Sequence, residues 1–113
     1  VFGPDLADIE RIARQVEQGA AENVYALQLM NASDHRRQVV VRVEPSDLVR
    51  LYKPIVVDLG PAQATTVTAT VRMLSIEAER HAGEVVHIRF VVPTINAPDR
   101  FELDESSTFL VPR

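Results

Sequence analysis

The chain has 113 residues, of which 46% are hydrophobic and 25% are charged, as expected of one folded globular domain and not of a disordered segment. With 12 basic and 16 acidic residues its formal net charge is −4, which argues against binding to nucleic acid or to an anionic membrane surface. The absence of cysteine excludes disulfides, a thiolate nucleophile and iron–sulfur ligands within this segment. No apolar stretch approaches the roughly 20 residues that cross a bilayer, so we expect no direct membrane insertion of this segment.

The first 20 residues allow two interpretations. Apolar residues recur with helical spacing from Leu6 to Ala20, Asp5 stands at a capping position and Gly19 stands where a helix would end, which favours an amphipathic helix. The alternative is a short edge strand over Ile12–Glu17, with Gln18–Gly19 as the turn into the next strand.

From Asn23 onward the hydrophobic pattern has a period of two, which predicts β-strands. The run Asn23–Asn31 is partly apolar on both faces and is expected to be a central, well-covered strand. The other predicted strands are Arg37–Glu44, Ile55–Leu59, Thr65–Met73, Glu84–Val92 and a last strand made of Phe101–Leu103 and Ser107–Val111, interrupted at Asp104–Glu105. Two connections are predicted between them: Ser46–Lys53, with room for one helical turn, and the polar stretch Ser75–Gly83.

About seven short strands separated by turn signals predict an all-β fold, an immunoglobulin-like or fibronectin-III-like antiparallel β-sandwich. Antibody domains have a cysteine pair and a tryptophan, and this chain has neither. We therefore infer the architecture and not the antibody family.

Three stretches of the sequence are similar to one family. The run Glu22–Asn31 (Glu-Asn-Val-Tyr-Ala-Leu-Gln-Leu-Met-Asn), the ending Ser107–Arg113 (Ser-Thr-Phe-Leu-Val-Pro-Arg) and Arg14–Gly19 resemble the C-terminal immunoglobulin-like domain of the FixG (CcoG) family. The resemblance runs from about residue 11 to the end and favours the edge-strand interpretation of Ile12–Glu17. Residues 1–10 depart from the family sequence. We therefore expect an N-terminal extension over 1–10 and the sandwich domain over 11–113. A helix over residues 5–11 remains an open alternative.

The resemblance implies a function that the composition does not. Members of the family are membrane proteins with ferredoxin-like iron–sulfur motifs, and they act as accessory proteins in assembling cbb-type cytochrome c oxidase, through copper delivery or reduction. By this resemblance the segment is a non-catalytic, periplasmic interaction domain of an inner-membrane protein, and its partners are oxidase assembly components or the rest of the same chain. The iron–sulfur clusters belong to the remainder of the protein, and no cofactor is expected here.

A copper-binding periplasmic domain is the alternative function. The ligand types that suit copper are found at Met30, Met73, His35, His81 and His87. On the predicted strands, however, Met73 faces inward, His87 faces outward, and the other histidines lie in two different connections. Because a metal site needs converging ligands, we expect core methionines and solvated histidines, and no metal site.

No catalytic residue is expected either. Ser33, Asp34 and His35 have the residue types of a hydrolase triad, but three consecutive residues in a tight turn cannot place nucleophile, base and orienting acid in line. Hydrogen bonding within the turn is the expected role of these side chains.

The remaining candidate is a partner surface on one sheet. If the Arg37–Glu44 strand pairs with the Glu84–Val92 strand and with the last strand, their outward side chains form valines ringed by charge and flanked by Glu102, a composition that suits docking of a protein. The residues of this predicted surface are Val40, Arg42, Val85, His87, Arg89 and Val91. An ordinary sheet face is the alternative interpretation, and a free-standing periplasmic adhesion or chaperone-like module is a further possible function.

Overall fold

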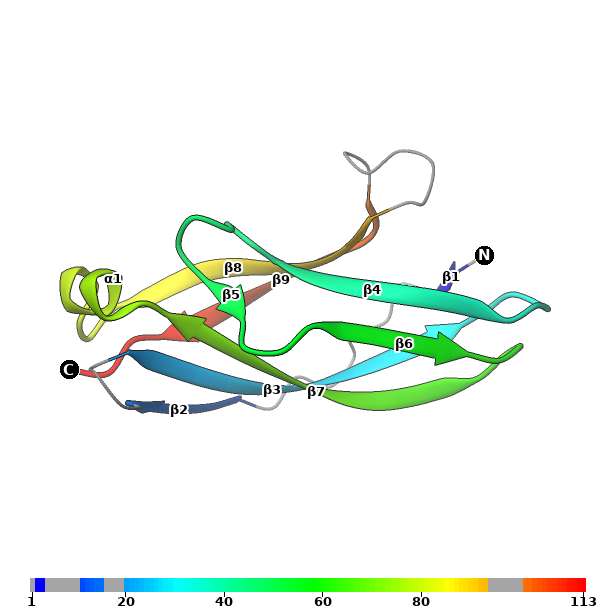
Figure 1. The fold of residues 1–113 in the computed structure, drawn as a ribbon, viewed down its shortest axis with the longest axis horizontal. Coiled ribbons are helices and arrows are strands. Elements are labelled where there is room, and N and C mark those ends of the chain that lie inside the picture. The colour runs from blue at the N-terminus through cyan, green and yellow to red at the C-terminus, as the bar shows by residue number, and fades with distance from the viewer. Residues whose placement is uncertain (1, 4–10, 16–19, 94–100) are drawn as a thin grey trace.

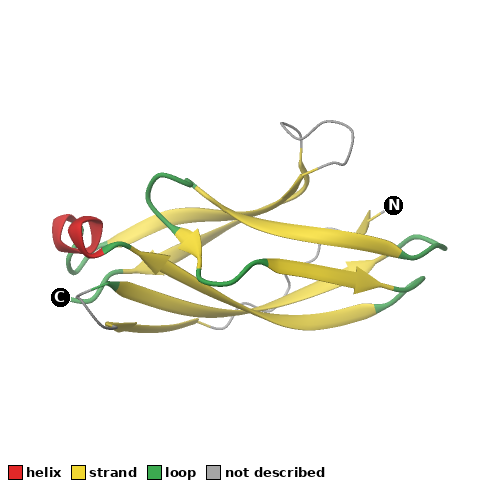
Figure 2. Cartoon of the chain, in the orientation of Figure 1, coloured by secondary structure: helices red, strands yellow, loops and turns green. Residues whose placement is uncertain are grey.

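The computed structural model describes residues 2–3, 11–15, 20–93 and 101–113. Over these residues two antiparallel sheets pack face to face, with one short helix at one end of the sandwich (Figure 1, Figure 2). In chain order the elements are β1 (Phe2–Gly3), β2 (Arg11–Gln15), β3 (Ala21–Asn31), β4 (Arg37–Glu44), β5 (Arg50–Leu51), β6 (Ile55–Leu59), β7 (Ala64–Met73), α1 (Ser75–Arg80), β8 (Val85–Pro93) and β9 (Phe101–Leu110). The predicted all-β, immunoglobulin-like sandwich is confirmed.

The two sheets have simple orders. The first is β1-β3-β7-β5, with β2 also pairing with β3, and the second is β6-β4-β8-β9. On one edge of β3, β1 pairs with its last residues and β2 with its first, while β7 pairs along the other edge. The central position predicted for this strand is therefore confirmed. The two-residue strands β1 and β5 were not anticipated from the sequence.

The core is built from the inward faces of both sheets. Alternate residues of β4 (Val39, Val41, Val43) and of β7 (Ala69, Val71, Met73) are buried, as the period of two predicts. At the centre the rings of Tyr25 and Phe90 meet edge to face, with centroids 5.0 Å apart and planes at 71°, the favoured arrangement of an aromatic pair.

Polar side chains of β3 tie its two ends to other parts of the chain. The Asn23 amide donates to the Leu110 carbonyl at 2.8 Å and accepts from the Leu110 N–H at 2.9 Å, and the Tyr25 hydroxyl donates to the Thr108 carbonyl at 2.7 Å. At the other end the two N–H groups of the buried Asn31 amide are shared among three carbonyls, those of His35, Leu59 and Gly60. These bonds join β3 to β9 across the sandwich and to the turn after β6.

The amino-terminal region resolves one of the open alternatives. Arg11–Gln15 is strand β2, so the edge-strand interpretation is confirmed there and a helix through this stretch is wrong. Phe2 and Gly3 also pair with β3, which brings part of the expected extension 1–10 into the sheet. The predicted turn at Gln18–Gly19 and residues 5–10 of the open helix lie outside the described residues.

Two further predictions about elements are wrong. The stretch predicted as a polar connection, Ser75–Gly83, begins with the helix α1, whose Glu-Ala-Glu-Arg end consists of strong helix formers and whose Ala78 is buried against the core.

The last strand is not interrupted at Asp104–Glu105: β9 is continuous, because Asp104 points outward and pairs with Arg89. The irregularity in this pair of strands lies instead at Val92/Pro93.

Among the described residues, no helix is both long enough and apolar enough to cross a membrane.

Candidate functional site on the outer face of the four-stranded sheet

The outer face of β4, β8 and β9 contains most of the surface predicted from the sequence. Because alternate residues of these strands point outward, Arg42, His87 and Arg89 are exposed. The side chains of Val40 and Val85 are also exposed, at 42% and 56%. As predicted, β4 pairs with β8. The last strand, β9, pairs with β8 and not with β4, contrary to the prediction.

Val91 is the exception, and its predicted place in an exposed surface is wrong. It is fully buried, although it stands outside the hydrophobic core cluster. Its register neighbours are Arg42 on β4 and Asp104 on β9, and Arg89 follows two positions away on the same face. The valine therefore lies between long polar side chains whose apolar stems can cover it.

The exposed valines do not form one patch. Since β4 and β8 pair with Val43 opposite Phe90, Val40 and Val85 lie near opposite ends of β8, on the order of 25 Å apart at the rise of a β-strand. Val40 is instead paired with Val56 on β6, which is 55% exposed. The apolar part of this face is thus at the β4–β6 end, away from Val85.

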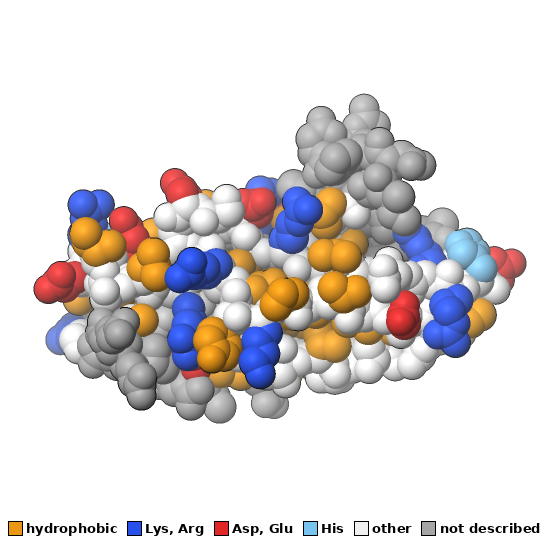
Figure 3. All heavy atoms as spheres, viewed as in Figure 1, with side chains coloured by type: hydrophobic (Ala, Val, Ile, Leu, Met, Phe, Trp, Pro, Cys, Tyr) orange, Lys and Arg blue, Asp and Glu red, His pale blue; other side chains and the backbone are white. Residues whose placement is uncertain are grey.

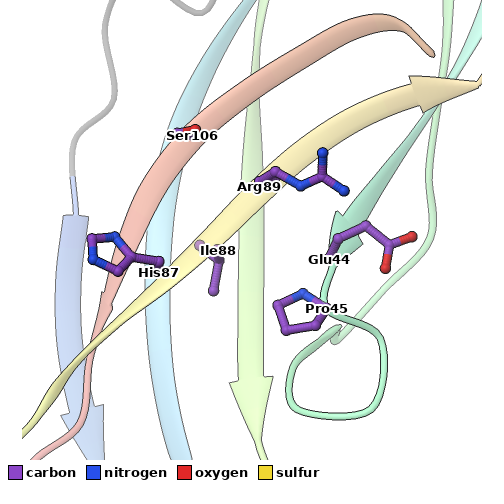
Figure 4. A pocket seen from close by; sticks show the side chains of 6 residues that line it. All are labelled: Glu44, Pro45, His87, Ile88, Arg89 and Ser106. Atoms are coloured by element: carbon purple, nitrogen blue, oxygen red, sulfur yellow. The ribbon is translucent and has the colours of Figure 1, made fainter.

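A pocket opens on this face where β4 leaves the sheet (Figure 4). The β4–β8 pairing ends at Glu44 and Arg89, and Pro45, which cannot donate a backbone hydrogen bond, follows directly. The edge of β8 before Arg89 is therefore not paired with β4. The pocket has a volume of about 390 Å³ and is lined by Glu44, Pro45, His87, Ile88, Arg89 and Ser106.

The charged groups of the pocket are held by neighbours within the chain. Arg89 Nη1 donates to Asp104 Oδ2 at 2.7 Å, and Glu44 Oε2 accepts from the Ser46 N–H at 3.1 Å. Ile88, which also lines the pocket, is 1% exposed and belongs to the core. The pocket thus presents an acid, a guanidinium, an imidazole and a hydroxyl at the edge of the core. Exposed ion pairs contribute little stability, so such groups are better suited to selecting a partner than to holding the fold.

The five residues considered for copper are not brought together. Met73 is buried in the core, and Met30, 41% exposed, is paired with Ala64 at the opposite end of β7. His35 lies in the β3–β4 turn, while His81 follows α1 and contacts Glu84 at 2.7 Å. Over the described part of the chain, no three His, Cys, Asp or Glu side chains are grouped in a way that could hold a metal ion.

The Ser33-Asp34-His35 turn uses its side chains locally, as predicted. The Ser33 hydroxyl donates within the turn, with Asn31 Oδ1 at 2.6 Å and the His35 carbonyl at 2.9 Å as its acceptors. The hydrogen bond from the His35 ring to the Asp34 carboxylate, 3.3 Å long, lowers the pKa of Asp34 below its ordinary value. This geometry is that of a turn and not of a catalytic triad.

A charged cluster that the sequence did not single out lies on the outer face of the first sheet. The Glu22 carboxylate is 1% exposed and accepts from Arg72 Nε at 2.8 Å, and the Arg72 guanidinium lies 3.8 Å from the centre of the Tyr52 ring. Alternation shows that Arg72 points outward. It does not show that the register places Arg72 opposite Glu22, which is 50 residues earlier in the chain.

Comparison with known proteins gives one family and several similar folds. A family model described as "IG-like fold at C-terminal of FixG, putative oxidoreductase" matches residues 6–112. A solved FixG-related protein from Vibrio parahaemolyticus has a TM-score of 0.66 and 16% identity, with 94% of this chain and 96% of that chain covered.

Two other solved structures show the fold in different settings. A GH2 beta-galacturonidase from Eisenbergiella tayi bound to galacturonate has a TM-score of 0.67 and 14% identity, over 94% of this chain but 18% of that one. A protein from Archaeoglobus fulgidus has a TM-score of 0.56 and 18% identity, over 96% and 99% of the two chains. No curated protein matched the chain.

Proposed function

Since this chain belongs to the family of immunoglobulin-like domains at the C-terminus of FixG, we propose that it is a non-catalytic docking module of a larger, membrane-bound iron–sulfur accessory protein. In this proposal the module lies on the periplasmic side of the inner membrane. There it contacts components that assemble cbb-type cytochrome c oxidase, or the remainder of its own chain. Its docking surface is the outer face of β4, β8 and β9.

The observation that supports this surface most is the pocket beside Pro45. Glu44, His87 and Ser106 come from three different strands and line one pocket together with Arg89. The exposed pair Val40 and Val56 lies on the same outer face. Apolar groups bordered by charged and hydroxyl groups are the usual composition of a protein interface.

Two of the stretches that resemble the family, Glu22–Asn31 and Ser107–Arg113, contact each other in the structure. Asn23 and Tyr25 belong to the first stretch, and both bond the backbone of the second, at Leu110 and Thr108. These residues are buried or half-buried and hold the two sheets together. The recognisable sequence is therefore structural, which supports placing the docking function on the outer face instead.

The test replaces the pocket residues in the full-length protein, in a bacterium that needs it for this oxidase. The double variant His87→Ala/Arg89→Ala is compared with His35→Ala/Arg36→Ala, which removes the same two residue types from the exposed β3–β4 turn. We expect the first to lower assembled oxidase several-fold at unchanged amounts of the variant protein, and the second to leave it unchanged. Normal oxidase levels in the pocket variant would contradict the proposed surface.

A second arm addresses copper. The 113-residue chain is titrated with cuprous and cupric ions, and we expect no tight stoichiometric binding. Tight binding that is lost in His87→Ala would replace the docking proposal with a metal-handling function.

A further inference from the structure

A second surface, independent of the pocket on the four-stranded sheet, lies along the free edge of β7. On one side β7 pairs with β3 along its whole length. On the other side β5 pairs only with Val71 and Arg72, and the Tyr52 N–H adds one bond to the Thr70 carbonyl at 2.8 Å. Within the described residues, no strand pairs with Ala64–Ala69 on this edge.

The alternation of an antiparallel strand identifies which backbone groups this edge presents. The Thr70 carbonyl points toward Tyr52, whereas the Gln63 carbonyl points toward β3, where it accepts from the Asn31 N–H at 2.9 Å. Because neighbouring residues in a strand point their backbone groups to opposite sides, the even-numbered residues face the free edge. The N–H and carbonyl groups of Thr66 and Thr68 are therefore presented to an added strand.

A cationic cleft adjoins the end of this edge. It has a volume of about 590 Å³ and is lined by Glu22, Tyr52, Lys53, Pro54, Ile55, Thr68, Thr70 and Arg72. The Arg72 guanidinium covers the Tyr52 ring, and Lys53 Nζ lies 6.0 Å from the ring centre. Thr68 belongs both to the cleft and to the free edge, so the two form one continuous surface.

Basic side chains outnumber acidic ones at this cleft. Arg50 is directly opposite Arg72 in the β5–β7 register, an arrangement of like charges that disfavours the pair by itself. Glu22 is buried and offsets one of these charges. Figure 3 shows Lys and Arg side chains gathered around a hydrophobic one over β5 and the adjoining part of β7. The chain as a whole has a net charge of −4, so this local excess of positive charge is distinct from the average surface.

We propose that the free edge of β7 and the adjoining cationic cleft bind an extended, acidic segment of a partner protein by strand addition. Backbone bonds to Thr66 and Thr68 align the segment, as in other cases of β-strand addition. Its carboxylates meet Arg50, Lys53 and Arg72. A second copy of this chain is a poorer occupant, because the charged residue of its own β7 is Arg72, which would repel the same cleft.

The test uses the ¹⁵N-labelled 113-residue chain and a short peptide of alternating valine and glutamate, blocked at both ends. We expect the amide signals of Thr66 and Thr68 to shift with peptide, and the affinity to fall with salt. A matched peptide with lysine in place of glutamate should bind about ten-fold more weakly or worse, and so should a glutamate peptide with methylated backbone nitrogens.

Two pairs of variants separate the edge from the charge. Thr68→Pro removes an edge-facing N–H without removing a bond to β3 and should abolish binding, whereas Thr68→Val keeps that N–H and should retain it. Arg50→Gln/Lys53→Gln should weaken binding about ten-fold, and Arg36→Gln/Arg37→Gln on the other sheet should not. Three results would each overturn the proposal. They are unshifted β7 amide signals, equally tight binding of the lysine peptide, and shifts that grow with protein concentration alone, as in self-pairing. None of these outcomes depends on the pocket beside Pro45.

Discussion

β3 and β7 lie side by side in one sheet, but they use their polar groups in opposite ways. β3 is paired on both edges, and its Asn23, Tyr25 and Asn31 side chains find partners inside the chain. β7 is paired along its whole length on one edge only, and it exposes Thr66 and Thr68 to solvent. Polar residues of a strand thus stabilise the fold where their bonding partners lie within the chain. Where they face solvent, they remain available to bind another molecule.

Removing the most connected polar side chain of β3 should have the largest effect. Asn31→Leu leaves the carbonyls of Leu59 and Gly60 and the Ser33 hydroxyl without this partner in a buried site. We expect the free energy of unfolding to fall by about 3 kcal/mol or more, measured by urea denaturation. Ala32→Ser, at the exposed neighbouring position, is the control and should change it by less than about 0.5 kcal/mol. A small loss in Asn31→Leu would show that β3 is not held by its internal bonds.

The charge pair between the two strands should come next. Glu22→Gln removes a buried carboxylate from Arg72, whose side chain is 33% exposed and can still reach water. We therefore expect a loss of about 1–2 kcal/mol, less than for a fully buried pair. A double-mutant cycle with Arg72→Gln measures the coupling directly. A coupling energy of zero would mean that the pair does not contribute to joining β3 and β7.

Tyr25 offers a smaller and more selective change. Tyr25→Phe keeps the edge-to-face contact with Phe90 and removes the hydroxyl that donates to the Thr108 carbonyl, so we expect a loss of about 1 kcal/mol. Tyr52→Phe, on the exposed side next to β7, is the matched control and should lose less than about 0.5 kcal/mol. Equal effects of the two changes would remove the distinction between inner and outer tyrosines.

The smallest effect concerns the exposed turn after β3. The pKa of Asp34 is lowered from 3.8, chiefly by the hydrogen bond from His35. A carboxyl whose pKa is depressed in the folded state contributes stability above the unfolded value, and that contribution is lost as the pH falls through the folded value. Asp34→Asn should therefore lower stability slightly at neutral pH, change it less in acid, and so flatten the acid-induced loss of stability below about pH 3.8. A larger change in acid than at pH 7 would contradict this assignment.

Alternation and turn residues made several local features predictable from the sequence. Thr65–Met73 was expected as a strand with Met73 inward, and the hydrogen bonding of Ser33 within its turn was expected from residue type. Alternation was insufficient at Val91, which is buried although it stands at an outward position of β8. The helix at Ser75–Arg80 was missed because six residues give too short a pattern to distinguish from a polar loop.

Long-range contacts were beyond sequence reasoning for a different reason. The bond between Asn23 and Leu110 joins residues 87 positions apart, and no local pattern specifies which strands face each other across a sandwich. The candidate pocket also depends on where β4 leaves β8. The sequence pattern identifies its histidine and arginine as outward residues. Only the strand register shows that Glu44 and Ser106 are their neighbours.

The most direct test of the central claim compares an inner and an outer substitution in the same full-length protein. Asn31→Leu and His87→Ala/Arg89→Ala are introduced separately, and two amounts are measured in each strain: that of the folded full-length protein, and that of the cbb-type oxidase that we propose it helps to assemble. We expect the first to lower both amounts together, and the second to lower the oxidase while the full-length protein stays at its normal amount. A normal oxidase level in the second strain, or a loss that only follows the amount of full-length protein, would contradict the proposed docking surface.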